Sequence, residues 1–109
     1  MAFNEEVGNR LRVAFEPYPE VIEKKMFGGL AFMVQGHMCC GVNGDELMVR
    51  VDPDGYEEAL AQPHAREMDF TGRALKGFVY VAPVGFATDD DLAAWVERAA
   101  DFVLSQPPK

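Results

Sequence analysis

The first residues of the chain place apolar side chains at a helical interval. These positions recur every fourth residue, with charged or polar residues between them: Phe3, Val7, Leu11 and Phe15. Such spacing lines one face of a helix with apolar groups and predicts an amphipathic first helix. Pro17 and Pro19 end it, because the residue before a proline avoids the helical region.

Between residues 21 and 51 the pattern changes to that of β-strands. We expect four antiparallel strands in a meander, over 22–27, 30–35, 37–42 and 46–51. Gln35-Gly36 and Asn43-Gly44 are turn signals between them. Asn-Gly is the stronger signal, because a type I′ turn needs positive φ at both central residues.

The second half of the chain alternates helix and strand signals. Pro53 and Pro63 bracket a helix expected over 54–62, a short strand is expected around Met68 and Phe70, and another strand over 78–82. Thr88 is a suitable N-cap for a last helix. That helix carries an apolar stripe, which consists of Leu92, Trp95, Val96, Ala99 and Val103.

The predicted element order is α-β-β-β-β-α-β-β-α. This order indicates one α+β domain over residues 1–109, with two layers: an antiparallel β-sheet and helices packed on one face. The run from Leu30 to Val34 contains no polar residue, so both faces of the sheet are apolar in any register. With two-residue turns, one face would hold Ala31, Met33, Met38, Cys40, Leu47 and Val49, and the other Leu30, Phe32, Val34, His37, Cys39, Met48 and Arg50. Because a free sheet face is normally polar, we expect a homodimer that covers the second face, unless a helix lies there instead.

Composition narrows the classes of function. The chain has 109 residues, a net charge of -8, and 10 Lys and Arg against 18 Asp and Glu. This balance argues against direct nucleic-acid binding, because phosphate contacts need basic residues. No apolar run is long enough to span a membrane, and the charged N-terminus is unlike a secretory signal. Adjacent Cys39 and Cys40 are poorly placed for a disulfide, which favours reduced thiols and a cytoplasmic protein.

The residues that could carry chemistry form no complete site. A metal site or a nucleophile could be formed by His37, Cys39 and Cys40. The set of metal ligands is incomplete even when His64 is added. A free Cys is usually a buried apolar residue. The acidic run Asp89-Asp90-Asp91 fits the start of a helix better than a cation site. We therefore expect no cofactor, no metal and no catalytic residue.

Two further features are candidates for binding. Met26, Phe27, Gly28 and Gly29 form a turn or bulge between two strands, and a phosphate-binding nest there has weak support. Half of the Lys and Arg fall in the motif-bearing segments and are candidates to hold an anion or an acidic partner: Lys24, Lys25, Arg50, Arg73 and Lys76. A scatter of solvated charges is the alternative interpretation.

Several motifs resemble the N-terminal domain of the TfoX/Sxy family, and they span most of the chain. They stand in this order: Lys25-Met26-Phe27-Gly28-Gly29, Gly36-His37-Met38, Leu47-Met48-Val49-Arg50-Val51, the segment 72–81 (GRALKGFVYV), Leu92 and Trp95-Val96. The resemblance implies a two-layer α+β fold, a tendency to dimerise, and a role in regulating competence genes. Family members usually carry a second domain, whereas this chain ends at Lys109, so we expect a stand-alone version.

Two functional hypotheses follow. The first is a non-enzymatic binding or regulatory module that resembles the TfoX N-terminal domain and acts through contacts with a protein partner. The second is a small-molecule or anion-binding domain, with a minor enzymatic activity at most, that uses Arg50, Arg73 and Lys76.

Overall fold

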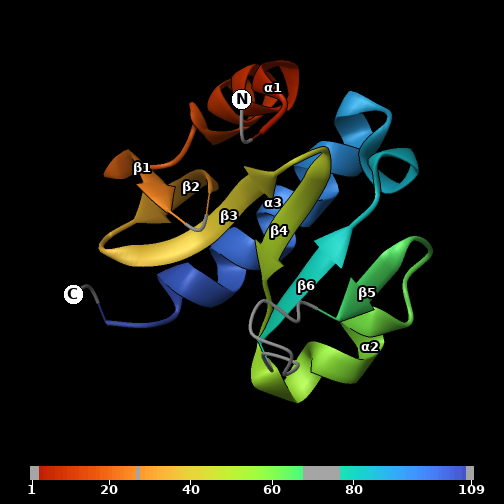
Figure 1. The fold of residues 1–109 in the computed structure, drawn as a ribbon. Coiled ribbons are helices and arrows are strands. Elements are labelled where there is room, and N and C mark those ends of the chain that lie inside the picture. Colours follow the sequence, from red (N-terminus) through yellow and green to blue (C-terminus); the bar gives the residue numbers. More distant parts are fainter. Residues whose placement is uncertain (1–2, 27, 68–76, 108–109) are drawn as a thin grey trace.

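The fold is an α+β arrangement, with a six-stranded antiparallel sheet covered by helices (Figure 1). The computed structural model describes residues 3–26, 28–67 and 77–107. Its helices are α1 (Glu5–Phe15), α2 (Tyr56–Leu60) and α3 (Asp89–Leu104), with short 3-10 turns η1 (Pro53–Gly55) and η2 (Pro83–Phe86). Its strands are β1 (Val21–Met26), β2 (Gly29–Val34), β3 (His37–Asn43), β4 (Glu46–Arg50), β5 (Ala65–Glu67) and β6 (Phe78–Val81).

The strand order across the sheet is β1-β2-β3-β4-β6-β5. The first four strands form the predicted meander, and β6 joins β4 before β5 closes the far edge. β5 begins three residues before Met68, and the strand predicted around Met68 and Phe70 lies outside the described residues. None of the helices in the described ranges combines the length and the apolarity that crossing a bilayer requires.

The first and last helices begin at side-chain caps, and the middle helix is shorter than predicted. The Asn4 side chain accepts hydrogen bonds from the backbone of Glu6 and Val7 at the start of α1. Thr88 Oγ1 accepts from the Asp91 backbone N–H at 3.1 Å, so the predicted cap of α3 is confirmed. The predicted helix over 54–62 is shorter than expected, because η1 occupies its first turn.

The main core lies between the helices and one face of the sheet. α1 packs on β2 through Phe15 and Phe32, whose rings stack with centroids 5.1 Å apart. α3 contributes its predicted stripe, in which Leu92, Val96 and Val103 are buried. Figure 1 shows α3 running behind β3 and β4.

The prediction that both sheet faces are apolar is confirmed, and Met38 and Cys39 lie on the predicted faces, but the assignment of residues to faces is wrong from Cys40 onward. Cys40, Leu47 and Val49 lie on the helix side with Phe32, whereas Met48 lies with Ala31 on the other side. The cause is an irregularity in the β2–β3 register: Phe32 pairs with Cys40, but Met33 pairs with Met38. Cys39 is thus an extra residue in β3, and such a bulge reverses the alternation on one side of it.

The second sheet face is largely buried within the single chain. Its cluster consists of Ala31, Met38, Met48 and Tyr80, none more than 9% exposed, with Met33 and Phe78 packed against it. These side chains therefore exclude water without a second copy. The homodimer stays a prediction, for which this face no longer supplies the reason.

Candidate functional site

The predicted cationic residues that the structure describes lie far apart on the sheet. Lys24 and Lys25 are exposed on β1, while Arg50 ends β4, and β2 and β3 lie between them. Three inter-strand steps correspond to about 14 Å. Arg73 and Lys76 lie outside the described residues. The structure therefore separates the β1 lysines from Arg50, and the cluster as a whole stays a prediction.

Arg50 is engaged with two aromatic rings. Its guanidinium carbon lies 5.8 Å from the centroid of Phe78 and 5.5 Å from that of Phe102 on α3. Both distances are within cation–π range. Arg50 therefore has a packing role at the end of the sheet, which joins β4 to β6 and α3.

The two lysines of β1 lie on opposite faces of the sheet. Lys24 pairs with Ala31 and Lys25 with Leu30, and residues directly opposite in an antiparallel pair share a face. Lys25 is thus on the helix side. Lys24 is on the other side, the face to which Met48 and, by alternation, Arg50 belong.

The glycine pair that follows these lysines is required by the backbone. Gly28 has φ +74, a conformation that side chains other than glycine rarely adopt. Gly29 opens β2 and pairs with Met26, so the central residues of the turn are 27 and 28, not the two glycines. Phe27 lies outside the described residues. This explains the Met-Phe-Gly-Gly segment as hairpin architecture.

The other two hairpins differ in how well they match prediction. Gln35 and Gly36 have φ +53 and +85, so a two-residue turn with positive φ at both positions joins β2 to β3 as expected. Asn43 instead pairs with Glu46 as part of the strand, and the turn consists of Gly44 and Asp45. The second turn is thus shifted by one residue.

Glu23 on β1 is held by α1. Arg12 Nε donates to Glu23 Oε2 and Arg12 Nη2 to Glu23 Oε1, both at 2.8 Å. This two-pronged contact holds the pKa of Glu23 below its ordinary value and raises that of Arg12. The contact fixes the β1–β2 hairpin to the first helix.

The thiols and the histidine of β3 are structural. Cys39 and Cys40 are fully buried, and burial, followed by the neighbouring Cys39 thiol, raises the pKa of Cys40 well above its ordinary value. His37 is 8% exposed, and its Nε2 lies 2.7 Å from the carbonyl oxygen of Pro107, to which it can donate. Within the described ranges, no group of three His, Cys, Asp or Glu side chains could hold a metal ion.

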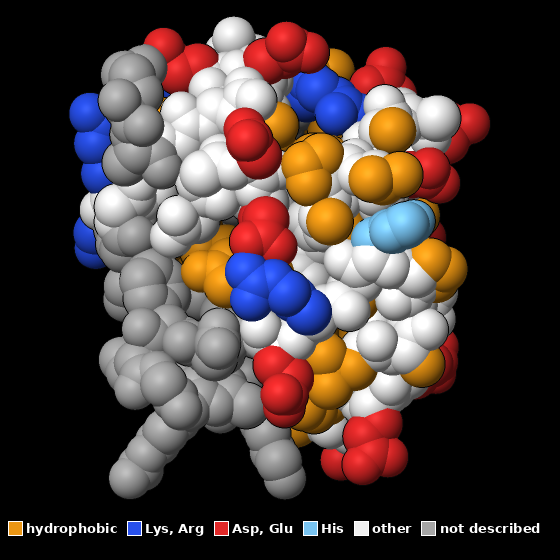
Figure 2. Space-filling model, turned by 45° about the vertical axis from the view of Figure 1, so that its right-hand side comes forward, with side chains coloured by type: hydrophobic (Ala, Val, Ile, Leu, Met, Phe, Trp, Pro, Cys, Tyr) orange, Lys and Arg blue, Asp and Glu red, His pale blue; other side chains and the backbone are white. Residues whose placement is uncertain are grey.

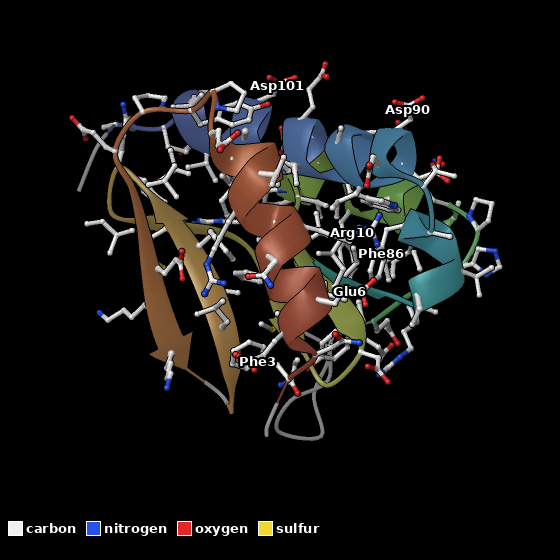
Figure 3. All side chains as sticks on the ribbon, turned by 90° about the horizontal axis from the view of Figure 1, so that it is seen from above. Phe3, Glu6, Arg10, Phe86, Asp90 and Asp101 are labelled. Carbon is white, nitrogen blue, oxygen red and sulfur yellow. The ribbon has the colours of Figure 1, made fainter. Side chains whose placement is uncertain are left out.

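Arg10, a residue that sequence reasoning did not single out, joins α1 to the segment before α3. Its Nη2 donates to the carbonyl oxygen of Phe86 at 2.8 Å, and its guanidinium carbon lies 5.8 Å from the Phe86 ring centroid. Figure 3 shows Arg10 and Phe86 together between α1 and η2, with Asp90 and Asp101 pointing outward from α3. The ion pair of Arg10 with Asp89 is looser, at 3.4 Å.

A cavity of about 360 Å³ lies between α3, η2 and the turn before β5. Its walls include Trp95 and Arg98, and the Arg98 guanidinium carbon lies 5.5 Å from the Trp95 ring centroid. His64, with φ +69, and Gly85 form the opposite side, where a Cβ at Gly85 would come within 3.1 Å of the His64 Cβ. Trp95 was expected only as a core residue, and the i, i+3 spacing of Trp95 and Arg98 is the signal that could have marked the cavity.

Acidic residues outnumber basic ones in the chain, 18 to 10. Figure 2 shows Asp and Glu scattered over the visible face, with only small groups of Lys and Arg between them. The acidic run Asp89-Asp90-Asp91 occupies the first turn of α3, where negative charge favours the helix dipole, as expected.

The family of the chain is shown by comparison with models of known protein families. The model of the TfoX N-terminal domain matches residues 14–103 of this 109-residue chain. Neither the comparison with curated proteins nor the comparison with solved structures gave a match. The match runs from the end of α1 to the last turn of α3, so it includes the whole sheet. The chain therefore belongs to the TfoX N-terminal domain family.

Proposed function

We propose that the chain is a binding and regulatory domain that acts through contact with another protein, without chemistry of its own. One observation carries the proposal: the strongest nucleophiles in the sequence are committed to packing. Cys39 and Cys40 are 0% exposed, and burial raises the pKa of the Cys40 thiol. Membership of a regulatory-type domain family supports the same conclusion.

Affinity capture from the native cell tests this function. The tagged chain is expected to retain a partner protein at physiological salt, and the purified chain is expected to leave the mobility of duplex DNA unchanged at low salt. Turnover of a small molecule by the purified chain, lost on Cys39→Ala, would overturn the proposal. A chain that retains no protein under any condition would overturn it as well.

The cavity beside Trp95 favours a second candidate function, the binding of a small ligand. The Arg98 guanidinium, stacked on Trp95 beside His64, suits a ligand with a carboxylate or phosphate group, which would compete with Glu58, whose Oε1 lies 3.7 Å from Arg98 Nη2. The chain has one Trp, so its fluorescence reports on this cavity directly.

Titration with nucleotides, phosphate and small carboxylates tests the second function. A ligand is expected to change Trp95 fluorescence and raise the melting temperature, and Arg98→Gln is expected to abolish both effects. Arg66→Gln, at the β5 edge, is the matched control. If no anion alters the fluorescence or the melting temperature, the cavity has no such role.

A further inference from the structure

The outer edge of β1 is long and regular. β1 is the first strand in the sheet order and pairs continuously with β2 from Val21 to Met26, without a bulge. At the other edge of the sheet, the described residues of β5 are three, Ala65–Glu67. Natural proteins blunt sheet edges with short strands, bulges, proline or charged side chains, lysine above all. Of these features β1 has the charged side chains but no bulge and no proline within its six residues.

The backbone groups that point outward from β1 belong to alternate residues. Gln35 N–H donates to the Glu20 carbonyl oxygen at 3.4 Å, so the backbone of Glu20 faces β2. Hydrogen-bonded and non-hydrogen-bonded pairs alternate along an antiparallel ladder. The backbone of Ile22 and Lys24 therefore also faces β2, and the N–H and C=O groups of Val21, Glu23 and Lys25 point away from the sheet.

The exposed edge carries unneutralised positive charge. Each arginine of the described ranges contacts a carboxylate or an aromatic ring. In those same ranges, Lys24 and Lys25 are the cations with no ion pair or ring contact, and both are exposed. On a chain with net charge -8, this strip is a local reversal of sign.

Self-pairing of two β1 strands is disfavoured by their own charges. Residues opposite each other in an antiparallel pair share a face. When two copies of one strand pair about a twofold axis, one residue must therefore lie opposite its own copy, with the axis between the two. An axis at the middle of β1 places two copies of Glu23 or two copies of Lys24 directly opposite each other. Like charges in that position destabilise the pair, so a second copy is a poor occupant of this edge.

We propose that β1 docks an extended acidic segment of a partner protein, which adds to the sheet as an antiparallel seventh strand. Because Lys24 and Lys25 face opposite sides, the matching segment carries two consecutive acidic residues, one for each lysine. An uncharged residue follows opposite Glu23, where an acidic side chain would meet a like charge, and then an apolar residue opposite Ile22, which is 64% exposed. This proposal rests on the proposed function, since it names the chemistry of the protein partner.

Synthetic peptides of about eight residues test the docking edge. The probe carries the order acidic-acidic-Thr-Ile within β-forming residues, and a peptide of scrambled order is its control. Binding is expected to protect the backbone amides of Val21, Glu23 and Lys25 from hydrogen exchange. A version N-methylated at the positions that face β1 is expected not to bind, whereas one N-methylated at the alternate positions binds as before.

Charge reversal supplies the second arm. The double variant Lys24→Glu, Lys25→Glu is expected to bind the probe peptide about tenfold more weakly or worse, and high salt is expected to reduce this loss of affinity. Unaltered affinity in this variant, binding that ignores N-methylation, or amide changes elsewhere on the chain would each overturn the proposal. If no acidic peptide binds and Lys24→Thr with Lys25→Thr makes the chain self-associate, the lysines only guard the edge and the proposal is wrong.

The outcome is separable from that of the proposed function. If the charge-reversed variant still captures the cellular partner as well as the wild type does, the regulatory function stands and the β1 edge is not its docking site. If neither chain captures any protein, the proposed function itself fails.

Discussion

Gly29 opens β2 directly against the backbone of β3, where a Cβ atom at Gly29 would lie 2.2 Å from the carbonyl oxygen of Val42. A contact under 3.0 Å with backbone cannot be relieved by moving a flexible side chain. Gly29 is therefore fixed by the approach of the two strands, and Gly28 by its positive φ. The two glycines of the motif have separate physical reasons.

We expect Gly29→Ala to lower the free energy of unfolding by about 3 kcal/mol, because the strands must separate to accept the methyl group. Urea unfolding followed by circular dichroism measures the change. Gly44→Ala is the first control: its φ is +58 but its Cβ would meet open space, so about 1 kcal/mol is expected. Gly55→Ala, with ordinary backbone and room for a Cβ, should be nearly neutral. Equal losses at Gly29 and Gly44 would contradict the steric explanation.

The order of the elements was predictable from the sequence because it depends on local signals. The spacing of apolar side chains, the positions of the prolines and the cap at Thr88 all depend on residues close together in the sequence. These signals located the helices and the meander. The assignment of residues to sheet faces failed because one extra residue, Cys39, enters the ladder at Phe32 and Met33. The residues at that point are all apolar or weakly polar: Phe32 and Met33 on β2, and Met38, Cys39 and Cys40 on β3. No alternation of apolar and polar side chains therefore remained to reveal the bulge.

The candidate site was less predictable than the fold. Lys24, Lys25 and Arg50 are close to motifs in sequence, but their proximity in space depends on strand order, and two strands separate them. The cavity beside Trp95 lies between two regions distant in the sequence, residues 62–64 and residues 84–98. Local pattern cannot bring such segments together, which is why Arg98 was not singled out.

The contact of Arg12 with Glu23 predicts a pH dependence of stability. The pKa of Glu23 is lowered in the folded state, so the contact stabilises the fold above the ordinary value of 4.5. This contribution is lost as pH falls through the lowered pKa. We expect Glu23→Gln to cost about 0.5 kcal/mol at pH 7, since both side chains are partly exposed and solvent screens them.

Urea unfolding of wild type and Glu23→Gln at pH 7 and pH 3 measures this difference. The two chains should differ at pH 7 and converge at low pH, and Glu16→Gln, an exposed residue, should match the wild type throughout. A difference that persists undiminished at low pH would mean that the Glu23 carboxylate is not its source.

Arg10 predicts a stability change with weak salt dependence. Its hydrogen bond to the Phe86 carbonyl oxygen is partly buried, and its ion pair with Asp89 is long. We expect Arg10→Ala to lower the free energy of unfolding by about 1–2 kcal/mol, since it leaves a carbonyl group unpaired. Asp89→Asn should cost well under 1 kcal/mol. Unfolding at low and high salt separates the contribution of the ion pair from that of the hydrogen bond to the carbonyl group. If high salt removes the effect of Arg10→Ala, the ion pair is responsible and the carbonyl contact is not.

The buried thiols predict low reactivity in the native state. The pKa of Cys40 is raised above its ordinary value of 9.0 by burial, so very little thiolate forms at pH 8. Both sulfur atoms also lie in side chains that are 0% exposed.

We expect a disulfide reagent such as Ellman's to react with the folded chain only as fast as the chain opens, and with both thiols at once in denaturant. In Cys40→Ala, Cys39 should still react no faster than that variant opens, as measured by hydrogen exchange, because the barrier is access. Rapid reaction of one thiol in the folded chain, retained in Cys40→Ala and lost in Cys39→Ala, would identify Cys39 as accessible and reopen the case for thiol chemistry.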